Sequence, residues 1–246
     1  MRYLHFVIAL CCLPSVVVSA ENPREPVLVE TRRIWDKAPH SAFTDLIRFK
    51  DRWYCVFREA EGHGSQDGVL RVITSADGAE WKSAALVRMT LQDLIDLHPE
   101  VPPEGSAVDL RDPKLCLTPD GRLMLNAGMY YNGRDELLSL AWWSDDGQTW
   151  GRPARIGEHR YWLWRITWHK GTAYGFGYGT NENQGTLRLY KSADGRQFDT
   201  LVENAFDVGY PNETSMVFLG DDTCYCLLRR DGDPNTAQLG IAGPPY

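Results

Sequence analysis

Apolar and polar residues alternate along this chain in short runs that are separated by turn-forming residues. Examples are residues 43–49 (FTDLIRF), 53–59 (WYCVFRE) and 69–75 (VLRVITS), which are rich in aromatic and β-branched residues. Runs of this length, bounded by Gly, Asp, Pro and Lys, are typical of strands and are short for helices. The pattern predicts an all-β chain of short strands joined by tight turns.

A seven-residue pattern, S-x-D-G-x-x-[WF], occurs three times, at residues 75–81, 144–150 and 192–198. Each copy follows a strand-like run. Asp can accept hydrogen bonds from the backbone of its own turn, and Gly adopts the positive φ that such a turn needs. We therefore expect three hairpin turns with an aromatic residue packed beneath each, and we assign none of their residues to catalysis.

Each copy of this pattern ends a longer unit of four short strands. The units open at Phe43, Asp112 and Trp162, and a fourth opens at Glu213. Four-stranded units that recur at intervals of roughly 45 to 70 residues are typical of β-propeller blades. The fourth unit lacks its last strand, so we expect the natural ring to be larger and this chain to be a C-terminally truncated form, a fragment or part of an assembly.

The N-terminus resembles a secretory signal peptide. Arg2 precedes an apolar run over residues 6–18, and Val18-Ser19-Ala20 is a small-residue cleavage site. The run is shorter than the roughly 20 residues that a membrane-spanning helix needs. We predict a signal peptide at 1–20, an N-terminal segment at 21–42 and an incomplete propeller at 43–246. The mature protein would be secreted or periplasmic, with no membrane span after cleavage.

Composition and charge narrow the classes of partner. The chain has 9 Trp, 11 Tyr, 8 Phe and 22 Gly, which supports β structure with tight turns. A net charge of −7 without a basic cluster argues against a nucleic-acid partner. Cys55, Cys116, Cys224 and Cys226 lie in apolar strand-like runs, so we expect buried free thiols in preference to disulfides. Their spacing fits no zinc motif, and we predict no metal or cofactor.

The three S-x-D-G-x-x-[WF] turns resemble the Asp boxes of the sialidase (neuraminidase) superfamily, and the resemblance extends from about residue 30 to the end of the chain. It implies a six-bladed propeller, of which about four blades are present here. It also implies an exo-acting glycoside hydrolase that holds a sugar carboxylate with three arginines. Such enzymes use a Tyr nucleophile activated by a Glu, and an Asp as acid/base. Asp boxes also occur in propellers that are not sialidases.

The family's site residues carry over only in part. Glu213, which stands sixteen residues before Arg229, resembles the activating Glu that precedes a triad Arg. The loop that contains Asp67 resembles the place of the acid/base Asp. Residues 40–45 (HSAFTD) contain no Arg where the family has its first one, so Arg58 or Arg165 would have to replace it. The Tyr nucleophile and the last arginine of the family come from blades that this chain lacks.

Charged residues at the openings of the blades suggest a second arrangement. The first strand of a propeller blade lines the central channel, where a charge is costly unless it has a role. Glycoside hydrolysis commonly uses two carboxylates, and Asp112 and Glu213 form a candidate pair. Arg111-Asp112-Pro113 before an apolar strand also resembles a segment of five-bladed glycosidases. Asp before Pro can equally be a simple turn.

These lines of reasoning define one candidate site and two functions. The predicted catalytic residues are Glu213, Asp67 and Asp112. The predicted substrate-binding residues are Arg58, Arg229, Arg165 and Arg111. The first function is a secreted, sialidase-like glycoside hydrolase that acts on carbohydrate, with sialosides among its candidate substrates. The alternative is a non-catalytic propeller that binds glycans or protein. Convergence of these side chains on one pocket would favour the site.

Overall fold

The computed structural model describes residues 26–97, 99, 107–131 and 136–246. The predicted signal peptide at 1–20 lies outside the described residues. The chain divides into two units, Met1–Arg33 and Ile34–Tyr246. Residues 26–33, the described part of the first unit, form neither helix nor strand. Among the described helices, none is long and apolar enough to cross a membrane.

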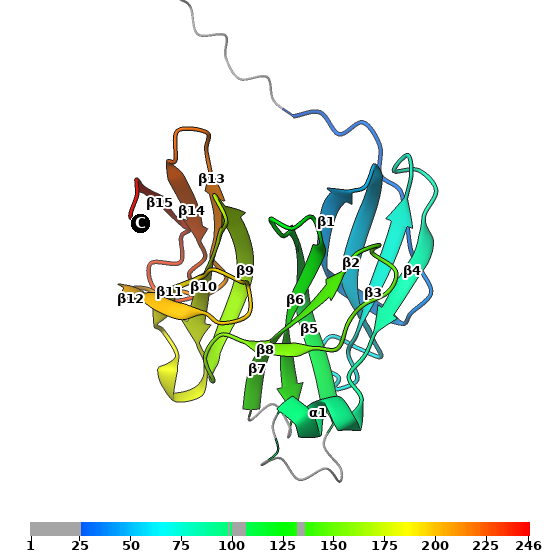
Figure 1. The fold of residues 1–246 in the computed structure, drawn as a ribbon, viewed down its shortest axis with the longest axis horizontal. Helices are drawn as coiled ribbons and strands as arrows, with labels where there is room; N and C mark the ends of the chain where they lie inside the picture. The colour runs from blue at the N-terminus through cyan, green and yellow to red at the C-terminus, as the bar shows by residue number, and fades with distance from the viewer. Residues whose placement is uncertain (1–25, 98, 100–106, 132–135) are drawn as a thin grey trace, which may run out of the picture. The chain divides into compact units, whose positions relative to one another are not determined.

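The second unit contains four antiparallel sheets (Figure 1). Blade 1 comprises β1 (His40–Phe49), β2 (Arg52–Ala60), β3 (Val69–Ser75) and β4 (Lys82–Val87). Blade 2 comprises β5 (Val108–Leu117), β6 (Leu123–Tyr131), β7 (Glu136–Ser144) and β8 (Ala154–Ile156). Blade 3 comprises β9 (Tyr161–His169), β10 (Thr172–Gly179), β11 (Leu187–Ser192) and β12 (Asp199–Phe206). Blade 4 comprises β13 (Ser215–Phe218), β14 (Cys224–Leu228) and β15 (Gln238–Ala242).

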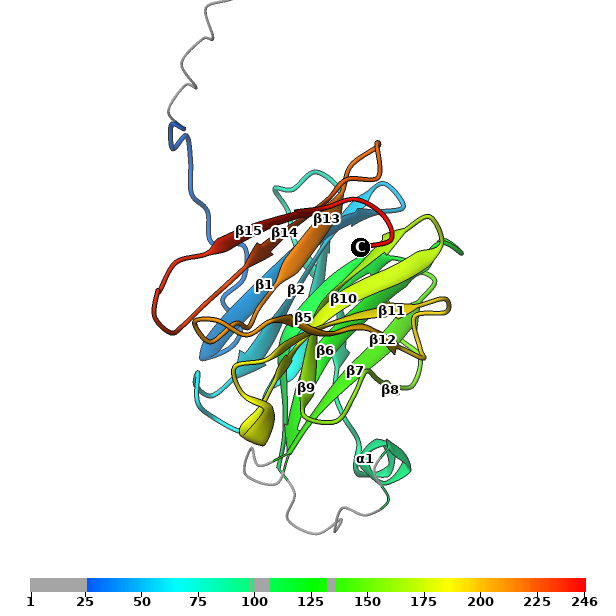
Figure 2. The ribbon, with the colours of Figure 1, turned by 90° about the vertical axis from the view of Figure 1, so that its left-hand side faces the viewer.

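The strands of each blade pair in the order of the chain, and β1, β5, β9 and β13 pack in succession. Figure 2 shows blade 4, in orange and red, on the near side of the other blades. The only helices described are α1 (Leu91–Leu97), between blades 1 and 2, and the short 3-10 helix η2 (Asn181–Asn183) within blade 3. The all-β propeller of four started blades that the sequence predicts is therefore confirmed.

The three repeated turns join the two outer strands of blades 1 to 3, and the hydrogen bonds from the turn backbone to their Ser and Asp side chains are the same in each. In the second copy, Ser144 Oγ accepts from Gly147 N at 2.8 Å, and Asp146 Oδ1 accepts from Gln148 N at 2.8 Å and Thr149 N at 2.7 Å. Gly147 has a φ of +72°. All of these partners lie within the turn, so the seven residues specify its shape locally.

The turn of blade 2 also packs against blade 1. The phenol of Tyr54 donates to the carbonyl oxygen of Asp146 at 2.9 Å, and the Lys50 ammonium donates to that of Asp145. In blade 3, the Arg196 guanidinium lies 3.8 Å from the ring centre of Trp143 in blade 2. These turns therefore hold neighbouring blades together at the outer strands.

The apolar core lies between the blades. One large cluster joins blades 1 and 2 and includes Trp142, a second joins blades 2 and 3 and includes Trp143, and a third joins blades 3 and 4. The four described cysteines are free thiols, as expected. Burial raises the pKa of Cys55 to about 11 and that of Cys116 to about 12, so both are inert, protonated core residues at neutral pH.

The innermost strands of blades 1 to 3 each carry one extra residue at the same level, and blade 4 has the equivalent extra residue just before β13. The flanking register pairs are Ala42↔Arg58 and Asp45↔Val56 in blade 1, Arg111↔Gly128 and Lys114↔Asn126 in blade 2, Leu163↔Gly177 and Ile166↔Gly175 in blade 3, and Pro211↔Arg230 and Ser215↔Leu227 in blade 4. Such a bulge bends a strand and redirects the side chain at the extra position. The bulges contain Phe43, Asp112, Trp164 and Glu213.

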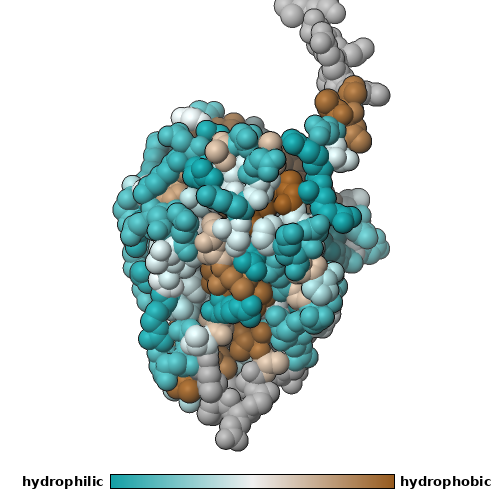
Figure 3. Space-filling view, turned by 90° about the vertical axis from the view of Figure 1, so that its right-hand side faces the viewer, coloured by the Kyte–Doolittle hydropathy of each residue, from teal (hydrophilic) through white to brown (hydrophobic). Residues whose placement is uncertain are grey.

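Two faces of the second unit expose apolar side chains. Viewed from the blade 1 side, Figure 3 shows a strip of apolar residues between polar flanks. On blade 4, the exposed large apolar residues are Val217, Leu219, Leu227, Leu239 and Ile241. The apolar side chains of these faces are exposed to solvent, whereas those between blades 1 and 2 and between blades 2 and 3 are buried.

Candidate functional site

A cavity of about 530 Å³ is lined by residues from all four blades and therefore lies at the propeller axis, where the bulged strands meet. Its charged and ionisable walls are His63, Arg111, Asp112, Glu213, Arg229 and Asp231. Its aromatic walls are Phe43, Tyr130, Trp162, Tyr178 and Tyr210. A polar cavity with aromatic faces of this size suits a small hydroxylated ligand.

Asp112 occupies the bulge of β5 with a φ of +51°, an uncommon conformation for a residue other than glycine. Burial raises the pKa of its carboxyl group to about 6, against the opposing effect of Lys114. The neighbouring negative charge of Glu213 raises this pKa further, and Arg111 and Arg58 lower it. Asp112 therefore exchanges a proton near neutral pH, as a general acid or base must.

Glu213 occupies the corresponding position in blade 4. Its carboxylate forms an ion pair with Arg229, with Nη1 and Oε1 2.7 Å apart. Arg229 also pairs with Asp231 at 3.0 Å, and Asp231 accepts a hydrogen bond from Asn212 Nδ2 at 2.8 Å. These contacts fix the orientation of the Glu213 carboxylate at the cavity wall.

Three aromatic rings form one wall of the cavity. Trp162 stacks on Tyr178 with ring centres 5.7 Å apart and planes at 23°, and Tyr130 meets Trp162 edge-on at 5.4 Å. The Trp162 indole Nε1 is buried and has no hydrogen-bond partner among the described residues. Burial raises the pKa of Tyr178 well above 10, so its phenol stays protonated and can donate a hydrogen bond.

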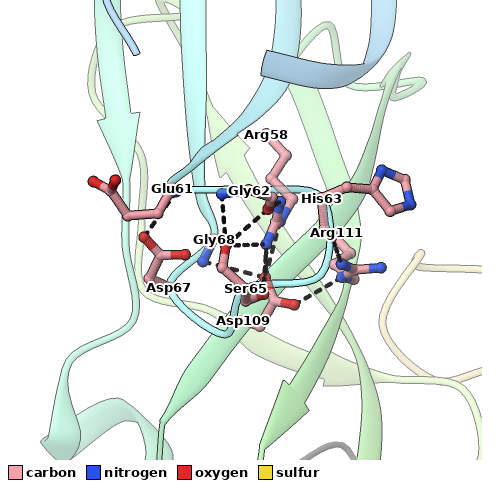
Figure 4. A network of polar contacts seen from close by, with 9 residues as sticks. All are labelled: Arg58, Glu61, Gly62, His63, Ser65, Asp67, Gly68, Asp109 and Arg111. Atoms are coloured by element: carbon pink, nitrogen blue, oxygen red, sulfur yellow. Dashed lines mark hydrogen bonds and ion pairs between the residues drawn. The ribbon is translucent and has the colours of Figure 1, made fainter. Parts of the chain in front are cut away.

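Arg58 lies in a closed polar network beside the cavity (Figure 4). The side chains of Arg58 and Asp109 are 0% and 1% exposed and form an ion pair at 2.8 Å. Arg58 also donates to the carbonyl oxygens of Gly62 at 3.0 Å and Ser65 at 2.8 Å. Arg58 therefore shapes the loop after β2 and does not line the cavity.

Arg111 lies on the other side of Asp109, to which its Nε donates at 2.7 Å. Its Nη2 donates to the carbonyl oxygen of His63. The His63 ring meets Phe43 edge-on with centres 5.3 Å apart. Arg111 Nη1 makes no hydrogen bond among the described residues, and it is the nitrogen that Arg111 can offer to a ligand.

The remaining two predicted site residues lie elsewhere. Asp67 is exposed, and its Oδ2 accepts from Glu61 N at 3.0 Å in the network of Figure 4. A hydrogen bond from Ser65 lowers its pKa, the opposite of the shift that an acid catalyst at neutral pH needs. Arg165 forms an ion pair with Asp45 at 2.7 Å. Neither residue lines the cavity.

The structure thus brings together Asp112, Glu213, Arg111 and Arg229, and it separates Arg58, Asp67 and Arg165 from them. Arg229 lines the cavity, whereas Arg230 is buried and donates to the carbonyl oxygen of Thr236 at 2.7 Å. Neighbouring residues of an extended segment point to opposite sides, so only one of the two arginines reaches the cavity. Sequence reasoning missed Tyr178 and Asp231, which reach the cavity from the second strand of blade 3 and the loop after β14.

The comparisons with known proteins identify the fold. No family model and no curated protein sequence matches the chain. An α-L-arabinofuranosidase of Fusarium graminearum in complex with arabinobiose aligns with a TM-score of 0.66 and 14% identity, over 84% of this chain and 64% of that protein. An α-L-arabinanase of Penicillium chrysogenum aligns with a TM-score of 0.65 and 14% identity, over 84% and 64%. A Hadza microbial sialidase aligns with a TM-score of 0.61 and 13% identity, over 84% and 45%.

These similarities support the β-propeller fold. The chain spans less than two thirds of the length of each of these three proteins. Among the residues that the structure describes, no cluster of three His, Cys, Asp or Glu side chains could hold a metal ion.

Proposed function

We propose that this chain is a carbohydrate-active propeller of the glycoside hydrolase type, in which Asp112 and Glu213 are the catalytic carboxylates. The observation that carries the proposal is the convergence of these two acids, from the bulge of β5 and the equivalent position before β13, on one axial cavity with aromatic walls. Glycosidases usually place two carboxyl groups beside the scissile bond. The three repeated turns and the similarity to propeller hydrolases support the same proposal.

The two acids have different surroundings and so suit different roles. Asp112, with a pKa raised to about 6, is the candidate acid that protonates the leaving oxygen. Glu213, paired with Arg229, is the candidate carboxylate that acts on the sugar or on an attacking water. Tyr178 and Arg111 Nη1 would donate hydrogen bonds to sugar hydroxyls, and Trp162 would pack against an apolar sugar face.

The charges in the cavity favour a neutral terminal sugar over a sialoside. Arg229 is already paired with Glu213 and Asp231, and two of the three guanidinium nitrogens of Arg111 are occupied. A sialic acid carboxylate would have to displace these partners. An L-arabinofuranosyl group is the first candidate, since the Fusarium and Penicillium proteins are an arabinofuranosidase and an arabinanase that bind arabinobiose, and a sialosyl group is the second. Residues 1–20 support export of the protein.

A panel of fluorogenic 4-methylumbelliferyl glycosides tests this function. We expect the wild-type chain to release the fluorophore from the α-L-arabinofuranoside, and D112N and E213Q to lower kcat by at least about 100-fold. The control variant D67N changes a carboxylate outside the cavity and should keep full activity. If no arabinoside, galactoside or sialoside is hydrolysed while calorimetry shows sugar binding, the non-catalytic alternative holds. The observation that favours this non-catalytic alternative is the aromatic wall, because a sugar can pack against aromatic rings without a catalytic acid.

A further inference from the structure

Asp112 and Pro113 form the bulge that directs the Asp112 side chain into the cavity, and neither residue has a register partner of its own on β6. The register shifts between Arg111 and Lys114, so Asp112 and Pro113 share one facing residue. The Lys114 ammonium lies 3.3 Å from the carbonyl oxygen of Asp112 and 3.5 Å from that of Pro113, at long hydrogen-bond distance. The side chain of Lys114 thus folds back over the bulge that precedes it.

Lys114 is buried although it carries a charge. Its exposed fraction is 7%, and its Nζ lies 4.3 Å from the ring centre of Trp164. Among the described residues no carboxylate lies within ion-pair distance of it. A buried cation without a direct counterion is costly, so its retention at this point calls for a role.

An ion pair from two other blades supports the same segment. Asp45, on β1, accepts from the backbone N–H of Leu115 at 2.7 Å and pairs with Arg165, on β9, at 2.7 Å. Asp45 therefore ties blades 1, 2 and 3 together immediately after the bulge. Arg165, which the sequence suggested as a substrate-binding residue, is placed to hold Asp45.

We propose that Lys114 is a positioning residue for Asp112, which fixes the bulge through its two carbonyls and places a positive charge on the same bulge as the carboxyl group. The Asp45–Arg165 pair anchors β5, the strand that carries Asp112 and Lys114. The catalytic purpose of Lys114 rests on the proposed function. The effect of Lys114 on the bulge and on the ionisation of Asp112 does not depend on that function.

The ionisation of Asp112 reports directly on this arrangement. The charged and ionisable groups that act on it electrostatically are Glu213 before β13, Arg111 and Lys114 on β5, Arg58 on β2 and Tyr178 on β10. Lys114 is the strongest of the opposing influences that lower the pKa of Asp112. Without that ammonium, burial and Glu213 act with less opposition, so the pKa of Asp112 should rise.

The test is a ¹³C NMR titration of the Asp112 carboxyl carbon, whose signal is assigned by its absence in D112N. We expect K114M to raise the titration midpoint by about one pKa unit or more, since a nearby opposite charge shifts a carboxyl by one to three units. K114R should keep a midpoint close to that of the wild type. K170M is the matched control, because Lys170 is exposed and pairs with Asp222 in another part of the fold.

Lys114→Gln separates charge from position. Its amide can still donate to the bulge carbonyls but has no charge, so Lys114→Gln should raise the midpoint while preserving the thermal stability better than K114M. If K114M does not fold, Lys114→Gln supplies the titration. An unchanged Asp112 midpoint in either folded variant would overturn the proposal. The titration needs no substrate. Absence of hydrolysis would therefore refute the proposed function, whereas the role of Lys114 would still be decided by the Asp112 midpoint.

Discussion

Asp112 combines a left-handed backbone conformation with a buried carboxyl group. Both features oppose folding, and such a residue persists only where the surrounding structure holds it. Burial raises the pKa of its carboxyl group to about 6 in the folded protein, from an ordinary value of 3.8. The stabilising contribution of the protonated form is therefore complete below the unfolded pKa and is lost as the pH rises through 6.

D112N should consequently be more stable than the wild type at neutral pH. Asn is neutral at every pH and accepts a positive φ readily, so the gain should appear between pH 4 and 6 and level off above that. A shift of about two pKa units corresponds to at most about 3 kcal/mol. Urea unfolding at intervals from pH 4 to 8 measures it. D67N should show no pH trend in this range, because the pKa of Asp67 is lowered in the folded state and its contribution to stability changes only below about pH 4. A D112N gain independent of pH would argue against a titrating buried carboxyl.

The roles of single arginines could not be predicted from the sequence. Arg58 and Arg229 both follow a cysteine and two apolar residues in the sequence, Arg58 near the end of β2 and Arg229 directly after β14. Arg58 is occupied by Asp109, which stands on the next blade, and by two loop carbonyls, whereas Arg229 faces the cavity. Such a partner is distant in the sequence, and alternation along a strand indicates the face of a residue but not its partner.

At the scale of elements, the repeated turns were predictable because their partners are local. Ser144, Asp146 and the amides that they bind lie within seven residues. The bulges were not predictable, since an extra residue is defined only against the register of the neighbouring strand. This explains why sequence reasoning could suggest Asp112 and Glu213 as a pair but gave no structural reason for their equivalence.

A pair of glycine substitutions tests whether the turns also join the blades. Gly78 and Gly147 both have positive φ, so replacement by Ala should cost each about 1–2 kcal/mol from backbone strain. A Cβ at Gly147 would lie 2.3 Å from the Tyr54 ring of blade 1, whereas one at Gly78 would lie 3.9 Å from its nearest neighbour, Trp53. G147A should therefore lose a further 1–3 kcal/mol, roughly, through overpacking. Equal losses of unfolding free energy in urea would show that the turn of blade 2 acts only within its own blade.

At the scale of the molecule, the interfaces between blades 1, 2 and 3 are packed, whereas blade 4 presents apolar side chains to solvent. Leu239 and Ile241, on β15, are 64% and 61% exposed. β15 ends the sheet of blade 4, and no strand among the described residues pairs with its outer side. An edge strand with exposed apolar residues is a template for association with another chain.

We therefore expect the chain to self-associate in a concentration-dependent way through β15. The double variant L239K/I241K places two like charges along that edge and should shift sedimentation velocity profiles toward the monomer. L117K is the matched control, because Leu117 is a single exposed apolar residue at the end of β5. Neither Leu239 nor Ile241 lines the polar axial cavity, so sugar binding by the double variant should equal that of the wild type. A wild-type chain that stays monomeric at high concentration, or an L117K variant that dissociates as well as the double variant, would remove β15 as the site of association.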